Sequence, residues 1–157
     1  MRDSEHYLLF RLDSHRFAIE VGATERIIHA VEVTPLEGVP EVVLGIINVH
    51  GSIVPVYDLR RRFGIPAREI DITDQFLLAR ANQRTVALVT DAVLGVVQCP
   101  EGEDQAGRSG NRSALPLEDG PVPIHQLEQF LSADEEARLS AALAAMSATG
   151  TGAAARS

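Results

Sequence analysis

Short runs in which hydrophobic and polar positions alternate make up most of this chain. A period of two predicts β-strands with one buried face, because successive side chains of a strand point to opposite sides. The first two runs, residues 7–12 and 17–21, flank a turn at Asp13-Ser14 and predict a hairpin. Further strands are expected at residues 43–49, 53–57, 75–81, 84–89, 93–97 and 115–124. Strands this short and this frequent favour a mainly β fold of barrels or sandwiches.

Other segments carry helical or loop signals. Residues 23–29 are expected to form a short helix. Ser132 and Glu135 form a capping box, and the helix that follows has a narrow apolar stripe expected to pack on the protein itself, with a partner's groove as the alternative. Residues 100–112 are polar and glycine-rich, which predicts a mobile loop, and residues 148–157 are expected to form a disordered tail. The remainder, residues 1–147, is expected to be a single domain.

The segment from residue 43 to residue 64 carries the most local information. Its two apolar runs flank His50-Gly51-Ser52, where glycine supplies the positive φ that a tight hairpin turn requires. Asp58 stands where an N-cap would stand, before a charged helical turn that Gly64 ends. The segment therefore predicts strand, turn, strand and one turn of helix.

Composition narrows the range of functions. Hydrophobic residues make up 45% of the chain and charged residues 23%, which is ordinary for a globular domain, and no run reaches the roughly 20 apolar residues of a membrane span. The net charge of −8 argues against nucleic-acid and anionic-membrane partners. The single cysteine cannot form an internal disulfide, so the cytoplasm is the expected compartment.

No chemistry-bearing motif emerges. The five histidines lack metal-ligand spacing, so neither a metal nor another cofactor is expected. A phospho-acceptor role for Asp91 would need clustered carboxylates and a lysine, and because the chain has no lysine, Asp91 is expected to form turn or edge hydrogen bonds. Nucleophile, phosphate-loop and dinucleotide fingerprints are absent from the sequence, so an enzyme is not expected.

Residues 43–64 resemble the CheW family of bacterial chemotaxis coupling proteins, whose pattern is roughly G-V-I-N-L-R-G-x-I-V-P-V-x-D-L-R-x-R-F-G. The positions that fit are Gly45, Ile47, Asn48, Gly51, Ile53, Val54, Pro55, Val56, Asp58, Leu59, Arg60, Arg62, Phe63 and Gly64. Residues 7–21, 85–94 and 114–132 also resemble family segments. The resemblance implies two small five-stranded β-barrels packed around a common apolar core, with short helices and a C-terminal helix.

The same resemblance implies a noncatalytic adaptor with two partners. One is the regulatory domain of a sensor histidine kinase, and the other is the helical tip of a chemoreceptor, which would recruit this cytoplasmic protein to membrane-associated arrays. Self-association within such arrays is a further expectation. The alternatives are a scaffold in a chemosensory pathway with a non-motility output, a kinase-binding paralogue that does not engage receptors, and a small-molecule-binding module.

Two positions depart from the family pattern. His50 replaces the usual arginine, and Arg26 stands where the family usually has glutamate, which indicates altered partner choice unless it is drift at a rim position. The residues expected to contact partners are Arg26, Ile27, Asn48, His50, Arg60 and Arg62. Gly51 and Asp58 are expected to support that interface by shaping the turn and capping the helix. Core positions expected to matter only through stability are Leu8, Phe10, Ile19, Ile53, Val56, Leu88 and Val89.

Overall fold

The computed structural model describes residues 4–81, 84–100, 114–117 and 120–149. Its strands are β1 (Ser4–Leu12), β2 (His15–Glu20), β3 (Thr24–His29), β4 (Val43–Val49), β5 (Ser52–Tyr57), β6 (Gln75–Ala81), β7 (Arg84–Thr90), β8 (Ala92–Pro100), β9 (Ala114–Leu117) and β10 (Gly120–Pro123). Its helices are α1 (Leu59–Phe63) and α2 (Ala133–Thr149), with 3-10 turns η1 (Val21–Ala23) and η2 (Leu127–Phe130). The alternating pattern therefore predicted these strands with the exception of β3.

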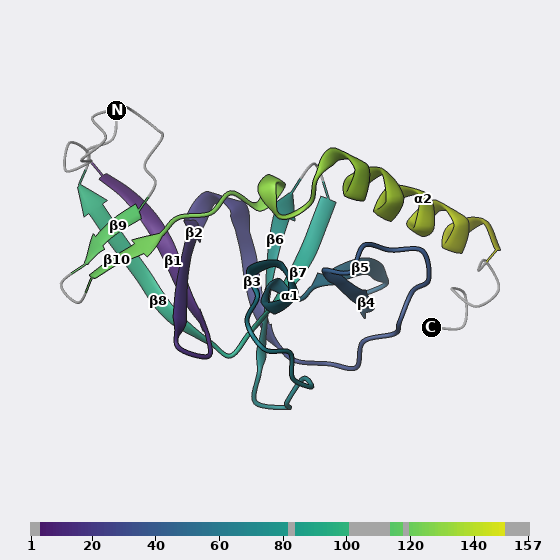
Figure 1. The fold of residues 1–157 in the computed structure, drawn as a ribbon, viewed down its shortest axis with the longest axis horizontal. Coiled ribbons are helices and arrows are strands. Elements are labelled where there is room, and N and C mark those ends of the chain that lie inside the picture. The colour runs from purple at the N-terminus through teal and green to yellow at the C-terminus, as the bar shows by residue number, and fades with distance from the viewer. Residues whose placement is uncertain (1–3, 82–83, 101–113, 118–119, 150–157) are drawn as a thin grey trace.

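The strands form three sheets in the described part of the chain. β2, β1 and β8 form one sheet in that order, and β10 pairs with β9 beside it. The third sheet has the order β3-β6-β7-β5-β4, in which β5 and β7 run parallel and the other pairs are antiparallel. Figure 1 shows the first two sheets at the left, and β4, β5 and α2 at the right.

Three apolar clusters fill the interior. The largest, called here the common core, takes side chains from β1 and β2 on one side and from β6 and β7 on the other, together with η2 and α2. A second cluster lies within the five-stranded sheet system, and a third lies between β1–β2 and β9–β10. Burial of this apolar surface is the main stabilising contribution to such a fold. A mainly β fold with a common core and a C-terminal helix is thus confirmed.

The expected helix at residues 23–29 is wrong. Residues Thr24–His29 form strand β3, and only Val21–Ala23 makes a helical turn. Along β3, Ile27 pairs with Leu77 and Ile28 with Phe76 of β6. The β-branched residues of this segment suit a pleated sheet, and the hydrogen bonds offered by β6 override the local helical signal.

Most of the expected core positions are buried, namely Leu8, Phe10, Ile19, Val56, Leu88 and Val89. Ile53 is the exception, since it remains 37% exposed. It pairs with Asn48 close to the β4–β5 turn, where the sheet runs beyond the core it covers. The expectation that Ile53 is a core residue is therefore corrected.

Helix α2 begins and packs as expected. The backbone N–H of Glu135 donates to Ser132 Oγ at 3.1 Å, and the N–H of Ser132 donates to Glu135 Oε1 at 2.9 Å, which completes the capping box. Leu139 is fully buried in the common core, with Leu143 packed against it. The helix includes two residues, 148 and 149, of the expected tail, and residues 150–157 lie outside the described part of the chain. Of the expected loop at residues 100–112, residue 100 instead ends strand β8, and the rest lies outside the described residues. In that described part, no helix is long and apolar enough to cross a membrane.

Candidate functional site

The β4–β5 turn is built by two residues with positive φ. His50 has φ 53° and Gly51 has φ 87°, and the pair Val49–Ser52 closes the hairpin around them. Positive φ at both central residues defines a type I′ turn, whose twist matches that of the flanking strands. Asn48 Oδ1 accepts a hydrogen bond from the N–H of Gly51 at 2.8 Å. Asn48 and Gly51 therefore shape the turn, and His50 is presented on it as an exposed side chain.

Helix α1 follows the same hairpin and has the predicted caps. Asp58 Oδ1 accepts a hydrogen bond from the N–H of Arg60 at 3.2 Å, and Gly64 ends the helix with φ 70°. Asp58 is itself buried, and burial raises the pKa of this carboxyl against the opposing effect of the Arg60 N–H. The two caps therefore fix the backbone of α1, which carries three arginine side chains.

Arg60 points inward and joins the two main sheets. Its side chain is 2% exposed, and one terminal nitrogen, Nη2, donates to Asp13 Oδ1 at 2.7 Å and to Asp91 Oδ2 at 2.9 Å. Asp13 lies in the β1–β2 turn, and Asp91 lies between β7 and β8, where the chain crosses from one sheet to the other. Arg60 therefore fastens α1 to both. We call the set Asp13, Arg60, Arg68, Asp74 and Asp91 the charged joint.

Asp91 is the centre of the charged joint. It also accepts a hydrogen bond from the N–H of Asp13 at 2.7 Å and contacts Arg68. Burial would raise the pKa of Asp91, but the hydrogen bonds from Arg60, the Asp13 backbone and Arg68 outweigh it and hold that pKa at about 2. The expectation of turn hydrogen bonding by Asp91 is confirmed, and the carboxylate stays ionised in the fold.

Arg68 extends the charged joint to the segment before β6. It forms a bidentate pair with Asp74, at 2.8 Å and 3.0 Å, in addition to its contact with Asp91. Asp74 is 2% exposed, so its charge is balanced inside the protein. Sequence reasoning found neither Arg68 nor Asp74, because these residues join the set through Asp91, which is 23 residues from Arg68, and only the fold brings them together.

Arg62 also has a partner within the chain. Its Nη2 lies 2.6 Å from Glu135 Oε1, the same carboxylate that caps α2, so this pair links α1 to the start of α2. Arg62 retains 33% exposure, whereas Arg60 has almost none. Of the two helix arginines expected to contact partners, only Arg62 therefore presents its side chain at the surface.

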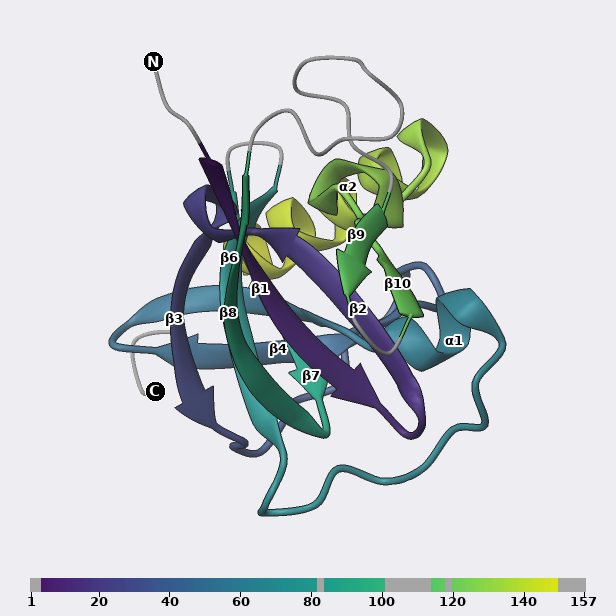
Figure 2. The same ribbon diagram turned by 90° about the vertical axis from the view of Figure 1, so that its left-hand side faces the viewer.

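An exposed apolar strip lies where the common core meets solvent. Directly paired residues of a sheet point to the same face. Ile27 pairs with Leu77 and Val96 pairs with Leu8, and both Leu77 and Leu8 belong to the common core. Ile27 is 40% exposed and Val96 57% exposed, since β3 and β8 are edge strands of their sheets. Figure 2 shows β3 and β8 on the same face of the molecule.

Leu94, at the bulge of β8, is a further exposed aliphatic residue of this strand, with 47% of it exposed. We call Ile27, Leu94 and Val96 the apolar edge. Arg26 is an exposed neighbour, but it pairs with Leu78 of the second cluster and so points to the opposite face of β3 from Ile27. The apolar residues of β8 were predicted from the sequence to form a strand, but the sequence did not predict that they are exposed.

The expected partner residues thus lie on different elements. Arg26 and Ile27 are on β3, Asn48 and His50 are on the β4–β5 hairpin, and β3 and β4 are at opposite ends of the strand order. In the described part of the chain, no group of three or more histidine, cysteine, aspartate or glutamate residues could hold a metal ion. The arrangement offers surfaces for contact and charged pairs that hold the sheets together.

Comparison with known proteins gives a consistent result. The model of the CheW-like domain matches residues 6–135. The chain is 26% identical over 136 residues to the chemotaxis protein CheW of Rhizobium meliloti, covering 82% of this chain and 88% of that protein. It is 26% identical over 110 residues to the chemotaxis protein CheW of Bacillus subtilis, covering 70% of each. The crystal structure of the scaffolding protein TtCheW from Thermoanaerobacter tengcongensis superposes with a TM-score of 0.71 at 22% identity, over 83% of this chain and 94% of that one, which shows a shared fold.

Proposed function

Because the chain belongs to the CheW-like domain family, whose members are noncatalytic scaffolds, we propose that it is an adaptor that couples chemoreceptors to a sensor histidine kinase. The observation that carries this proposal is the family match over residues 6–135. In this proposal the protein works in the cytoplasm, bound to receptor arrays, and its two sheet systems act as two small barrels. Each barrel would present its own surface to a partner.

The apolar edge supports a receptor contact. Ile27, Leu94 and Val96 expose aliphatic surface from two different sheets, beside the core that joins them. A receptor helix lying there would contact both sheets at once and would bury this surface. The arginines Arg26 and Arg62 and the turn residue His50 would then contribute polar contacts at other surfaces of the protein, with Asn48, Gly51 and Asp58 in supporting roles.

The charged joint supports a signalling role. A coupling protein transmits a signal only if its binding favours one kinase state over another, and this requires a fixed geometry between its two binding surfaces. Arg60, Asp13 and Asp91 connect α1, the β1–β2 turn and the crossover between the sheets. In this proposal the joint holds that geometry, which assigns Arg60 a positioning role instead of a partner contact.

The direct test is a titration of the purified protein against the regulatory domain of its histidine kinase, with and without a receptor cytoplasmic fragment. A ternary complex is expected. Binding to the kinase domain alone would favour the paralogue that does not engage receptors, and binding to neither would refute the proposal. Exchanging Ile27 for serine should weaken receptor binding, whereas Ile27→Val, which keeps an apolar side chain, should not.

Altered partner choice at Arg26 has its own test. If Arg26 meets an acidic residue of the partner, Arg26→Glu should lower the affinity and Arg26→Lys should preserve most of it. Both variants should keep the melting temperature, because Arg26 is exposed. Equal affinity of the three proteins would mean that the change from the family's glutamate is drift.

A further inference from the structure

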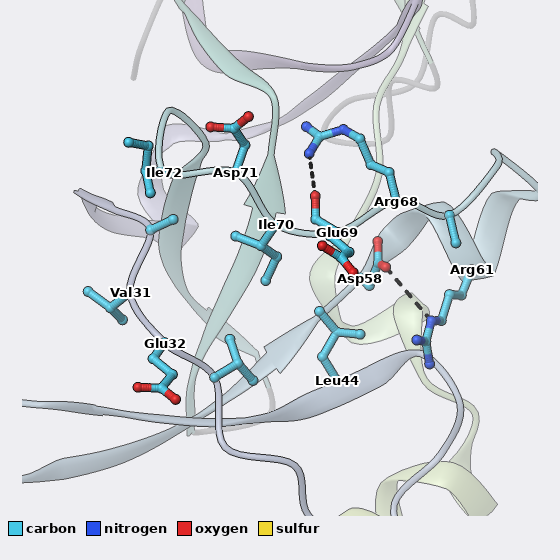
Figure 3. Close-up of a pocket in the computed structure, with 13 residues that line it drawn as sticks. Val31, Glu32, Leu44, Asp58, Arg61, Arg68, Glu69, Ile70, Asp71 and Ile72 are labelled. Atoms are coloured by element: carbon cyan, nitrogen blue, oxygen red, sulfur yellow. Dashed lines mark hydrogen bonds and ion pairs between the residues drawn. The ribbon is translucent and has the colours of Figure 1, made fainter.

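A pocket of about 700 Å³ lies between two irregular segments of the chain. One wall is formed by residues 30–33, which follow β3, and the other by residues 67–72, which precede β6. Leu44, Asp58 and Arg61 complete the lining, and Figure 3 shows the side chain of Ile70 on the second wall above that of Leu44. None of these residues belongs to the apolar edge.

Both walls are anchored at their ends. The N–H of Ala30 donates to the carbonyl of Asp74 at 3.1 Å, which ties the two walls together. At its other end the first wall is held by Thr34, which exchanges two backbone hydrogen bonds of 2.9 Å with Ile46 of β4. The second wall is held by the bidentate pair of Arg68 with Asp74. The pocket is therefore formed before any partner binds, which lowers the entropic cost of binding.

Aliphatic side chains line the interior of the pocket, and two more are exposed at its rims. Val33, Leu44 and Ile70 pack against the second cluster from the pocket side. Val31 on one wall is 46% exposed, and Ile72 on the other is 86% exposed. Two aliphatic side chains exposed on facing walls favour an occupant that brings an aliphatic side chain of its own.

The charge available at the rims is negative. Glu32, Glu69 and Asp71 are exposed there, and hydrogen bonds from Thr73 lower the pKa of Asp71, which keeps it ionised. The two cations of the lining are already engaged. Arg68 pairs with Asp74 and Asp91, and Arg61 donates to the carbonyl of Glu41 at 2.9 Å and lies near Asp58. A basic occupant is therefore complementary to this pocket, and an acidic one is not.

The first wall also offers backbone groups. Within the part of the chain that the structure describes, Val31, Glu32 and Val33 make no backbone hydrogen bond to another segment. Free N–H and C=O groups beside an apolar pocket are the feature that peptide-binding surfaces use to align an added segment. They favour a polypeptide over a small apolar molecule.

We propose that this pocket docks a segment of a partner protein in which aliphatic side chains are flanked by arginine or lysine. The aliphatic side chains enter between Val31 and Ile72, and the flanking cations pair with Glu32 and Glu69. This surface is separate from the apolar edge, and the proposal stands whether or not the chain couples a receptor to a kinase.

The probe is a synthetic peptide, acetyl-Gly-Arg-Lys-Leu-Ile-Arg-Lys-Gly-amide, titrated into the isotope-labelled full chain and followed by backbone amide chemical shifts. Shifts are expected at residues 30–33 and 67–72. The dissociation constant is expected to rise with salt, since exposed charge pairs are screened. The matched peptide with glutamate in place of each basic residue should bind at least about tenfold more weakly, because it meets like charges.

Two variants with the same charge change separate this pocket from general attraction to an acidic protein. Glu32→Gln with Glu69→Gln should weaken peptide binding about fivefold, as expected for the loss of two exposed ion pairs. Glu37→Gln with Glu128→Gln, at exposed positions outside the pocket, should leave the affinity unchanged. Ile72→Ser should weaken binding without lowering the melting temperature.

The proposal is overturned by any of three results. These are the absence of binding at millimolar peptide, shifts that map outside the two walls, and equal weakening by the two double variants. Binding of the acidic peptide with the same affinity would likewise remove the charge argument. None of these outcomes depends on a kinase or a receptor being present.

Discussion

Replacing Arg60 by methionine removes the cation that joins the two main sheets and keeps a long apolar side chain in its place. Arg60 is 2% exposed and contacts two carboxylates through Nη2, at 2.7 Å and 2.9 Å. Its Nε is buried without a hydrogen-bond partner in the described structure. The substitution thus removes two charged contacts and relieves one unsatisfied donor.

The size of the effect follows from Asp91. The fold lowers the pKa of Asp91 from 3.8 to about 2, and a difference of this size corresponds to roughly 2 kcal/mol of stabilisation of the ionised form. Arg60 shares this effect with Arg68 and the Asp13 N–H. The contact with Asp13 adds little, since that side chain is 44% exposed and the pair is screened by solvent. We therefore expect Arg60→Met to cost about 1–2 kcal/mol, below the roughly 3–5 kcal/mol of a fully buried broken pair.

The measurement is urea unfolding of the native protein, Arg60→Met, Asp91→Asn and the double variant. The coupling energy between the two positions should be about 1 kcal/mol, with an unchanged m-value. The pH dependence provides a second readout. Because the folded pKa of Asp91 is depressed, its contribution is complete above pH 3.8 and is lost as the pH falls toward about 2. Arg60→Met should flatten the loss of stability across that window.

Strict additivity of the two substitutions would show that Arg60 and Asp91 do not stabilise each other. A change in stability below about 0.5 kcal/mol for Arg60→Met would show that the joint has no net effect on the fold. Either result would refute the positioning role given to Arg60. If Arg60→Met lowers the stability by the expected amount but leaves kinase control unaltered, only the role of Arg60 in signalling would be refuted.

Three further predictions concern the fold and its pH dependence. Gly45→Ala should lower the free energy of unfolding in urea by about 2 kcal/mol or more, because the Cβ of the alanine would lie 2.1 Å from the Thr34 carbonyl oxygen. Gly22→Ala, which places its Cβ in open space, should leave the stability nearly unchanged. Burial lowers the pKa of His125, so the unfolded chain takes up a proton at a higher pH than the folded protein does, and stability should fall as the pH drops below about 6.5. His125→Phe should remove this part of the pH dependence of stability between about pH 7 and pH 5. Ser132→Ala should cost about 1 kcal/mol, measured by the same unfolding assay, through loss of the α2 cap; an unchanged midpoint would mean that Glu135 and Arg62 hold the helix start without it.

The local elements were predictable because their causes are local. Alternation of apolar residues gave β1, β2 and the β6–β7 hairpin, His50-Gly51 marked a tight turn, and Asp58 and Ser132 marked helix starts. In each case the determining interaction spans a few residues, so the pattern in the chain and the structure agree. The family pattern in residues 43–64 then identified the fold.

The site was less predictable, since exposure and pairing depend on distant parts of the chain. Arg60 and Arg62 are both arginines of one helical turn, and both were predicted to contact partners. In the structure, Arg60 is buried against Asp91, whereas Arg62 pairs with Glu135 at the surface. Ile27 and Ile53 were assigned to interface and core, yet both are partly exposed, at 40% and 37%.

The amino-acid pattern alone was therefore enough to predict the β-rich fold, the turn at His50-Gly51 and the family. That residues 24–29 form a strand depends on the packed fold, because β6 supplies the hydrogen bonds. It also decided that Arg60 faces inward, because Asp13 and Asp91 are 47 and 31 residues away along the chain and meet it only when the sheets pack together. Local propensity acts over a few residues, whereas burial and charge pairing are properties of the packed sheets as a whole.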